Sequence, residues 1–160
     1  MTQAILTTNL GTIKIKIYTD SMPITTKNFI DLAKRGFYDN TKFHRVIPKF
    51  MIQGGDPQSK NNAKRQQWGT GGPGYKISDE FTDNNKNFKG SIAMANSGPN
   101  TGGSQFFINV AGNHFLDNAH PVFGEVIDGL NIVIDISKTK RDHNDQPDED
   151  VVLEKVTIEE

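Results

Sequence analysis

The segment Ile13–Ile17, in which isoleucine alternates with lysine, constrains the fold more than any other part of the chain. Alternation of apolar and polar residues predicts a strand with one buried face and one face in solvent. The preceding run Ala4–Thr8 and the turn residues Asn9–Gly11 make this strand the second of a predicted β-hairpin. Further short apolar runs, broken by Gly, Asn and Pro, are typical of a β-sandwich or a β-barrel. These runs are Ser91–Met94, Gln105–Val110, Val122–Val126 and the alternating tail Lys155–Glu159, which we expect to close the sheet.

One helix is predicted near the N-terminus. Pro23 stands where the first turn of a helix accepts proline, and Gly36 ends the run. The apolar residues of the segment Phe29–Ala33 fall on one face of this helix. That face is expected to pack on the sheet.

Composition limits the classes of protein to consider. At 160 residues the chain is most simply one domain, residues 1–160, able to bury about two-thirds of its unfolded surface. A net charge of -1 gives no general attraction to nucleic acid or anionic membranes, so we expect neither partner. The absence of cysteine excludes disulfides, thiolate catalysis and Cys-based zinc sites. The start Met1–Leu6 lacks the features of a signal peptide, and no segment is long enough to cross a bilayer, so we expect a soluble cytoplasmic protein.

The segment Phe43–Asp56 places one permanent cation among large apolar side chains. Arg45 keeps its charge at any relevant pH, presents a planar fork of donors and has no carboxylate next to it in sequence. Beside Phe50 and Met51 it suggests a grip for a neutral ligand that carries a carbonyl group. The alternative is a surface arginine whose stem covers apolar residues while its head stays in water. This stretch alone does not decide between them.

Two glycine-rich loops match nucleotide-binding patterns by letter only. Gly69–Gly74 has the spacing G-x-G-x-x-G, but polar residues precede it and Pro73 interrupts the helix that the motif requires. Gly98–Gly103 has P-loop spacing, but Ser104 and Gln105 stand where Lys and Ser or Thr are required. We therefore predict no nucleotide site and no cofactor.

The histidines and the acidic run do not form a metal-binding pattern. His44, His114, His120 and His143 lack the i, i+4 spacing of a zinc helix, and no G-x-S-x-G nucleophile signature is present. We expect His44 to be structural, with its ring hydrogen-bonded in the core. The run Asp142–Asp150 lacks the ligand order of an EF-hand and predicts a solvated loop. No metal site is predicted.

A second block favours the ligand-binding interpretation of Arg45. The stretch Met94–Ile108 contains Asn-Ser-Gly-Pro-Asn-Thr-Gly-Gly-Ser-Gln-Phe-Phe, and Phe115–Asp117 and His120–Gly124 follow it. With the hairpin, the Pro23 helix and the Phe-His-Arg block, these residues resemble the cyclophilin family of peptidyl-prolyl cis-trans isomerases nearly from end to end. The resemblance implies a mainly β fold, a closed eight-stranded antiparallel β-barrel capped by two α-helices. The second helix would begin after Gly129, although β-branched residues there favour a strand by propensity.

The resemblance also implies a site on the outer wall of the barrel, since a barrel this small is filled by side chains. Arg45 would be the catalytic residue, with its guanidinium on the proline carbonyl and facing the imide nitrogen as the bond turns. Alternation puts Phe107 on the face of the site and Phe106 and Ile108 in the core. Apolar residues would enclose the proline ring, and a shallow groove would hold the residues that precede it. The expected substrate-binding residues are Phe50, Met51, Gln53, Gly69, Ala95, Asn96, Ser97, Gln105, Phe107, Phe115, Leu116 and His120.

The implied reaction needs no nucleophile, metal or cofactor. Rotation about a peptide bond faces a barrier of about 18–20 kcal/mol, and X-Pro bonds exchange slowly between two populated isomers. A donor that favours a pyramidal nitrogen and an apolar site that excludes water both lower this barrier. We expect proline-containing peptides and unfolded proteins as partners of a monomeric enzyme. The alternative is a proline-peptide binding module or a chaperone-like folding helper with incidental turnover, which would not need the charge of Arg45.

Three features depart from the family pattern. Phe115 stands where many members have Trp, whose indole N–H helps to bind cyclosporin, so we expect cyclosporin to bind weakly. Ala119 replaces a common Lys. The segment Gln58–Trp68 lengthens the loop between Asp56 and Gly69 and carries local positive charge. We interpret it as a flexible solvated insertion, the alternative being a contact that tunes substrate choice or binds an acidic partner.

Overall fold

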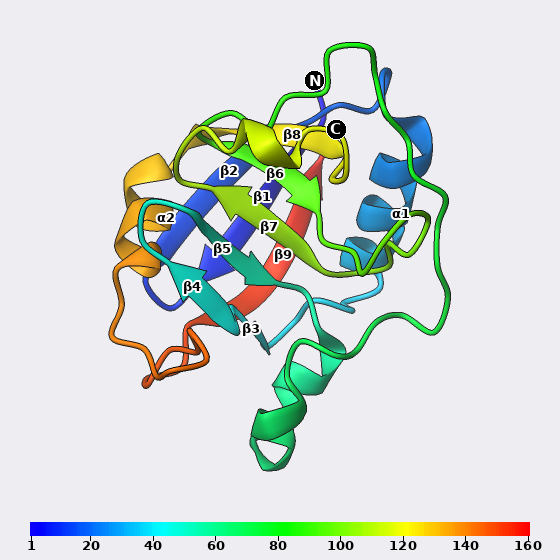
Figure 1. Cartoon of the computed structure of the whole chain (residues 1–160). Coiled ribbons are helices and arrows are strands. Elements are labelled where there is room, and N and C mark those ends of the chain that lie inside the picture. The colour runs from blue at the N-terminus through cyan, green and yellow to red at the C-terminus, as the bar shows by residue number, and fades with distance from the viewer.

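The computed structural model describes all residues, 1–160, and contains one nine-stranded sheet in which every neighbouring pair is antiparallel (Figure 1). The strands follow the order β3-β9-β1-β2-β8-β6-β7-β5-β4. The strands are β1 (Gln3–Thr8), β2 (Gly11–Ile17), β3 (Thr41–Lys42), β4 (Arg45–Ile47), β5 (Met51–Gly54), β6 (Ser91–Met94), β7 (Phe106–Asn109), β8 (Val122–Asp128) and β9 (Val152–Glu159). The helices are α1 (Pro23–Lys34) and α2 (Leu130–Ser137), with 3-10 turns η1 (Pro57–Lys60), η2 (Asn62–Gln67) and η3 (His114–Leu116).

The two edge strands of the sheet are consecutive in sequence, which forces the sheet to curl. β3 ends at Lys42 and β4 begins at Arg45, so the two edges lie within about 11 Å of each other along the chain. The predicted mainly β, antiparallel architecture with two helices is confirmed. The count differs from the expected eight, because the short strand β3 adds to one edge and the ladder does not continue from β4 to β3.

The N-terminal hairpin and the closing strand follow the predicted pattern. β1 pairs with β2 through the turn at Asn9-Leu10, and β9 pairs with the other side of β1, from Gln3 with Glu159 onwards. Gly11 has φ +142°, and a Cβ there would approach Ile132 to 2.7 Å. The hairpin therefore needs glycine at this position to pack against α2.

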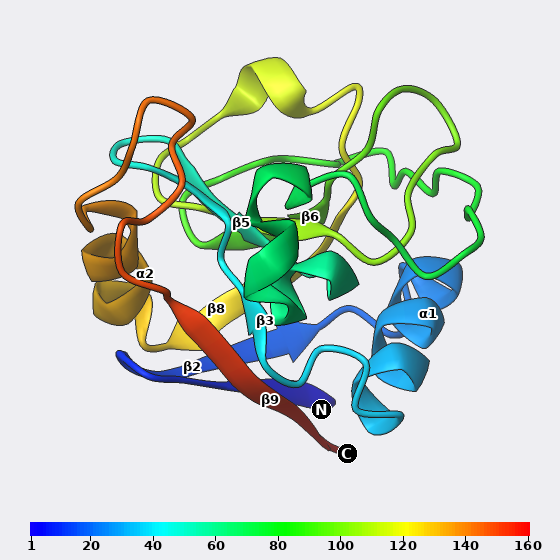
Figure 2. The ribbon, with the colours of Figure 1, turned by 90° about the horizontal axis from the view of Figure 1, so that it is seen from below.

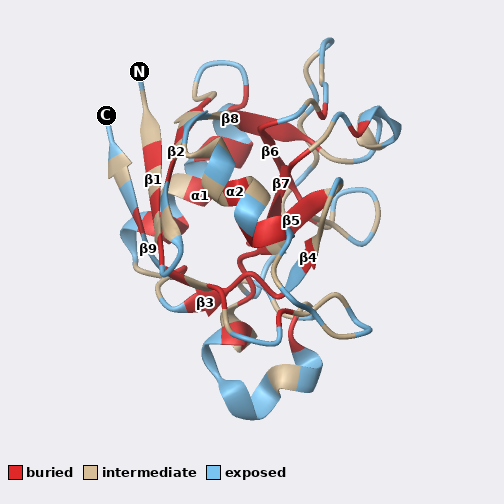
Figure 3. Cartoon of the chain, turned by 90° about the vertical axis from the view of Figure 1, so that its left-hand side faces the viewer, coloured by how far each residue is buried: buried red, intermediate tan, exposed pale blue.

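The concave side of the sheet holds the main core, which lies between the sheet and α1. Figure 3 shows the buried residues concentrated along the strands and on the helix faces turned toward them. Phe29 of α1 lies at its centre, with ring centroids 5.2 Å from Tyr38, 5.8 Å from Phe106 and 5.2 Å from Phe123. Aromatic pairs at these separations add to the stabilisation from area burial. This aromatic cluster ties the helix to strands β7 and β8.

Both helices form where expected and lie at opposite ends of the curled sheet (Figures 1 and 2). The first turn of α1 is capped from outside, since the Glu80 carboxylate accepts the N–H groups of Ile24 and Thr25 at 3.1 and 2.9 Å. In α2 the strand propensity of the β-branched residues is overridden, because Val133 and Ile136 are buried against the core. No helix of the chain has the length and apolar character needed to span a membrane.

The insertion, defined here as residues 57–68, is structured rather than a flexible solvated loop. It forms the 3-10 turns η1 and η2 and projects from the edge of the sheet (Figure 1). Ser59 is fully buried, with its hydroxyl accepting the N–H of Lys42 at 2.8 Å, and Trp68 is only 9% exposed. The sequence-based interpretation missed these anchors because they depend on contacts with β3, which is distant in sequence.

Candidate active site

The site is built on a row of residues that strand register aligns across the outer face of the sheet. Arg45 of β4 pairs with Gln53 of β5, Gln53 with Phe107 of β7, and Phe107 with Ala93 of β6. Directly opposed residues of an antiparallel pair point to the same face. The next residues along each strand, such as Ile52 and those beside Phe107, belong instead to the main core. Register alone therefore brings the cation, the amide and the aromatic ring together.

The apolar part of the site is a small second cluster on this outer face. Met51, Ala93, Phe107 and Val122 are its buried members. The half-buried residues packed against them include Phe50, Ala95 and Leu116. Such a surface patch, walled by aromatic and aliphatic side chains, suits one small apolar ring.

Arg45 carries the only free cationic fork beside this cluster. Its side chain is exposed and makes no hydrogen bond or ion pair within the chain. All of its guanidinium donors are thus available to a ligand. The strand register places Arg45 beside Gln53, next to the apolar cluster. This position favours a ligand-binding arginine over one that is only solvated.

The amides of Gln53 and Gln105 form a fixed chain. Gln53 donates its Nε2–H to Oε1 of Gln105 at 3.0 Å, and Gln105 donates both Nε2–H bonds to the carbonyls of Gly69 and Gly71 at 2.9 Å each. Both donors of Gln105 are therefore used within the protein. Gln105 orients Gln53, whose own carbonyl oxygen remains free for a ligand.

A buried carboxylate holds the glycine-rich loop from the other side. Asp56 is fully buried and accepts the N–H groups of Gln58, Gly69 and Gly71 at 2.8, 2.6 and 3.1 Å. Gly69 has φ +102°, and a Cβ on Gly71 would lie 2.2 Å from Asp56 Oδ1. These N–H groups point to Asp56 rather than outward, which is why the G-x-G-x-x-G spacing makes no phosphate site here.

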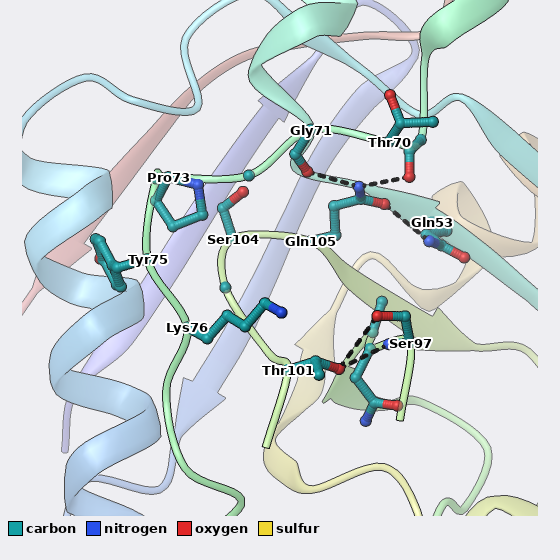
Figure 4. Close-up of a pocket in the computed structure, with 16 residues that line it drawn as sticks. Gln53, Thr70, Gly71, Pro73, Tyr75, Lys76, Ser97, Thr101, Ser104 and Gln105 are labelled. Carbon is teal, nitrogen blue, oxygen red and sulfur yellow. Dashed lines mark hydrogen bonds between the residues drawn. The ribbon is translucent and has the colours of Figure 1, made fainter. Parts of the chain in front are cut away.

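The first cleft, of about 500 Å³, adjoins the apolar cluster and is shown in Figure 4. Gly69–Lys76 form one of its walls, and Ala95–Ser97 with Gly103–Gln105 form the other. Lys76 extends its side chain across the cleft, whereas Tyr75 points toward α1, where its hydroxyl bonds Asn28. Ser97 is tied to Thr101 through its backbone N–H at 2.9 Å. The cleft is polar and fits an extended peptide backbone better than an apolar ligand.

The segment 113–120 covers one side of the apolar cluster, through Leu116 and His120. His120 donates Nδ1–H to the carbonyl of Met94 at 2.9 Å, since a carbonyl only accepts, and its ring meets Phe107 edge-on at 5.2 Å. Asn96 donates to the carbonyl of Ala119 at 2.8 Å. Phe115 is 76% exposed and stacks on Phe50 with centroids 5.9 Å apart. Phe115 therefore forms an exposed rim of the site, not a buried wall.

A network of amides and one carboxylate fixes this segment to the sheet. Asn113 donates to the carbonyl of Phe50 and to Asn109 Oδ1, and Asn109 donates to Asn87. Burial would raise the pKa of Asp117, but hydrogen bonds from Asn87 and His114 hold it below the ordinary value. Side-chain hydrogen bonds thus hold the rim in place, whereas backbone pairing between strands positions Arg45, Gln53 and Phe107.

His44, the neighbour of Arg45, is buried as expected. Burial lowers the pKa of its imidazole to about 4, so the ring is neutral at physiological pH. Its Nδ1 has no hydrogen-bond partner, so the expectation of a hydrogen-bonded ring is wrong for this nitrogen. A neutral His44 leaves Arg45 without a competing charge at its side.

All of the predicted site residues lie in one region. Arg45, Phe50, Met51, Phe107, Leu116 and His120 gather on the outer face with Phe115 at their exposed rim, and Gln53, Gly69, Ala95, Asn96, Ser97 and Gln105 line the first cleft. Sequence reasoning missed the supporting residues Asp56, Asn87, Asn109 and Asn113. Isolated Asp and Asn residues carry no recognisable spacing, so only the folded chain identifies them.

Comparison with known proteins agrees with this geometry. The family model described as "Cyclophilin type peptidyl-prolyl cis-trans isomerase/CLD" matches residues 3–158. Peptidyl-prolyl cis-trans isomerase-like 1 of Rhizopus delemar is 46% identical over 145 residues, which cover 90% of this chain and 85% of that protein. The Mycobacterium tuberculosis peptidyl-prolyl cis-trans isomerase A is 44% identical, over 97% of this chain and 91% of that protein. The chain belongs to the cyclophilin family.

A solved cyclophilin has the same fold. The crystal structure of a Cryptosporidium parvum cyclophilin-type isomerase superposes with a TM-score of 0.90 at 32% identity, covering 99% of this chain and 97% of that one. Family membership confirms the prediction of an enzyme of the isomerase class. The roles of individual residues within the cyclophilin site stay predictions.

Proposed function

We propose that this cyclophilin isomerises X-Pro bonds by Arg-assisted loss of amide resonance in an apolar proline pocket. The guanidinium of Arg45 would donate to the proline carbonyl and face the imide nitrogen as the bond turns. Donors aimed at charge that develops in the transition state, in a site that costs no reorganisation, are the main source of such stabilisation. The observation that carries the proposal is the unpartnered guanidinium in register with Gln53 and Phe107.

The apolar cluster supplies the second half of the mechanism. Phe50, Met51, Phe107 and Leu116 would surround the proline ring and exclude water from the twisted, less dipolar amide. A crystal structure of the Cryptosporidium parvum cyclophilin, 31% identical over 99% of both chains, was determined in the presence of the dipeptide Ala-Pro. This supports proline-containing peptides as the substrates here. Unfolded proteins with accessible X-Pro bonds would be the larger substrates of the monomeric enzyme.

Polar groups beside the pocket would fix the substrate backbone. The groove at Ala95–Ser97 would take the residues that precede the proline, with Asn96 held by Ala119. Gln53 would offer its free carbonyl oxygen, and His120 its Nε2, to the flanking peptide groups. Both side chains are oriented by protein hydrogen bonds, so little ordering is left for substrate binding.

The test is Arg45→Ala, with Arg35→Ala as the matched control. Arg35 is also exposed, but it lies at the end of α1, away from the site. We expect Arg45→Ala to lower kcat/KM on an X-Pro peptide by about 100-fold or more, as for a lost oxyanion donor, while peptide affinity falls less. Thermal unfolding should show the fold intact in both variants. Unchanged turnover by a folded Arg45→Ala protein would overturn the Arg-assisted mechanism, and a lack of turnover by the wild type would favour the binding-module alternative.

A further inference from the structure

Lys76 is the only charged residue that lines the first cleft. The rest of the lining consists of glycines, hydroxyl and amide side chains, and the uncharged residues Pro73, Tyr75 and Ala95. Figure 4 shows the side chain of Lys76 extended away from its own wall, toward the wall that carries Ser97. The proposed function uses the neutral groups of this cleft and gives the charge of Lys76 no role.

The ammonium of Lys76 has no partner within the chain, since it makes no hydrogen bond and no ion pair. The two acidic residues that follow it are engaged elsewhere and do not line the cleft. Glu80 accepts the first N–H groups of α1 with both of its carboxylate oxygens, and Asp79 accepts the N–H of Asn100 at 3.0 Å. All three N–H donors of the Lys76 ammonium are therefore available to a ligand.

Bonds between the two walls close the end of the first cleft that lies away from the proline pocket. Asn28 of α1 donates to the carbonyl of Gly103 at 2.7 Å and accepts the hydroxyl of Tyr75, so it joins both walls to the helix. The N–H of Ile77 donates to the carbonyl of Gly102 at 2.8 Å. The cleft is thus formed before a ligand binds, which lowers the entropic cost of binding.

The other end of the first cleft opens on the proline pocket. Gln53 lines the cleft there and pairs with both Arg45 and Phe107 across the strands. An extended peptide that enters from the pocket runs from Gln53 toward Tyr75. Its side chains alternate between two sides, so a side chain on one of these sides faces Lys76. A carboxylate in that place would accept a charge-assisted hydrogen bond from the ammonium, whereas a cationic side chain would be repelled.

We propose that Lys76 is a specificity-determining residue that favours substrates with an aspartate or glutamate among the residues before the proline. This inference rests on the proposed function, in which those residues occupy the first cleft. The charge of Arg45 is used there on the proline carbonyl, which leaves Lys76 as the cation that can read a substrate side chain. The proline pocket cannot supply such a preference, because it recognises only the proline ring and the backbone.

Peptides that differ only at the second residue before the proline provide the test. The residue directly before the proline is kept constant, because it changes the cis content of the free peptide. Acetyl-Ala-X-Ala-Pro-Ala-Ala amides, with X as Glu, Gln or Lys, are compared by two-dimensional exchange NMR, which needs no helper protease. We expect kcat/KM about fivefold higher for Glu than for Lys, the size of a partly screened charge interaction. The preference should shrink as salt is added.

The difference between these peptides should lie in KM rather than in kcat. The contact with Lys76 is remote from the bond that turns, so it stabilises the bound substrate and the transition state equally. A residue that supported only the fold would change turnover of the three peptides in the same proportion. The dependence of KM on the charge of X therefore separates a specificity role from a structural one.

Lys76→Gln is the decisive variant, and Lys89→Gln is its matched control. Both lysines are exposed and make no ion pair, but only Lys76 lines the cleft. We expect Lys76→Gln to bring the ratio of kcat/KM for Glu over Lys close to one, Lys76→Glu to invert it, and Lys89→Gln to retain it. A ratio near one in the wild type, or the same ratio in Lys76→Gln as in Lys89→Gln, would overturn the inference while leaving the proposed function intact. Failure of the wild type to isomerise any of the peptides would overturn both.

Discussion

Arg45, Gln53 and Phe107 stand on adjacent strands, whereas Phe115, Ala119 and the insertion stand on loops. Strand register fixes the first group, because a shift of one residue would turn every side chain to the other face. Side-chain hydrogen bonds and stacking fix the second group. All three departures from the cyclophilin pattern fall in the second group. A substitution on a loop alters a single contact, whereas a shift of a strand would displace all the aligned residues Arg45, Gln53 and Phe107. The site therefore departs from the cyclophilin pattern only where loops hold it.

The largest expected effect is at Asp56, where the strand-borne and loop-borne parts meet. Its buried carboxylate accepts three backbone N–H groups. Asp56→Asn keeps the shape but replaces one acceptor oxygen by an amide that opposes these donors. We expect a loss of about 4 kcal/mol in the free energy of unfolding, measured by urea denaturation, and lower kcat/KM as the Gly69–Gly71 loop loosens.

The control for Asp56 is Asp148→Asn, which removes an exposed carboxylate with only a 4.0 Å contact to Lys140. It should change stability by less than about 0.5 kcal/mol. If Asp56→Asn unfolded at the same urea concentration as wild type, the two parts of the site would be independent. Asp56 would then not couple the strands to the glycine-rich loop.

The next effect concerns His44, which lies between β3 and β4, directly before Arg45. The folded-state pKa of about 4 lies below the ordinary value of 6.5, so between these values the unfolded chain binds a proton that the folded chain does not. Stability is fully present above pH 6.5 and declines as pH falls toward 4, by about 3 kcal/mol in total. Urea unfolding across pH 4–7.5 measures this slope, which His44→Gln should remove.

His143→Gln serves as the control for His44, since His143 is exposed on the loop 142–146. It should leave the slope of stability against pH as in wild type. A His44→Gln protein with an unchanged slope would mean that other groups, such as the Asp117 network, dominate the acid response. The loop-borne part would then be the pH-sensitive one, which reverses the comparison.

The features that could be predicted from the sequence are mostly those on strands and helices, and the features that could not are mostly on loops. The hairpin, α1, the strands β6 to β8 and the split between Phe107 and its core neighbours all follow from local periodicity and turn residues. The residues that the resemblance implied for the site lie in one region, and their individual roles stay predictions. The insertion was misjudged, because its structure depends on contacts between Trp68 and Lys42 and between Arg65 and Asp150. Such pairs are far apart in sequence and carry no periodicity. The amide network around Asn109 was missed for the same reason.

The smallest expected effect tests the tolerance of the rim. Phe115 is largely exposed and stacks on Phe50, so it can offer a ligand an aromatic face but no hydrogen bond. Phe115→Trp adds an indole N–H at the same position without entering the apolar cluster. We expect cyclosporin to bind the wild type weakly and the variant more tightly by about 1 kcal/mol, the net value of one hydrogen bond, measured by titration calorimetry. Isomerisation of a short X-Pro peptide should change little, because in the proposed mechanism the proline ring packs on the apolar cluster and not on Phe115. Phe115→Leu is the matched control, since it keeps an apolar group but adds no donor and should not tighten binding.

Equal affinity of wild type and Phe115→Trp would show that the rim does not contact the drug. A large loss of peptide turnover in Phe115→Trp would instead place this loop position among the constrained residues of the site.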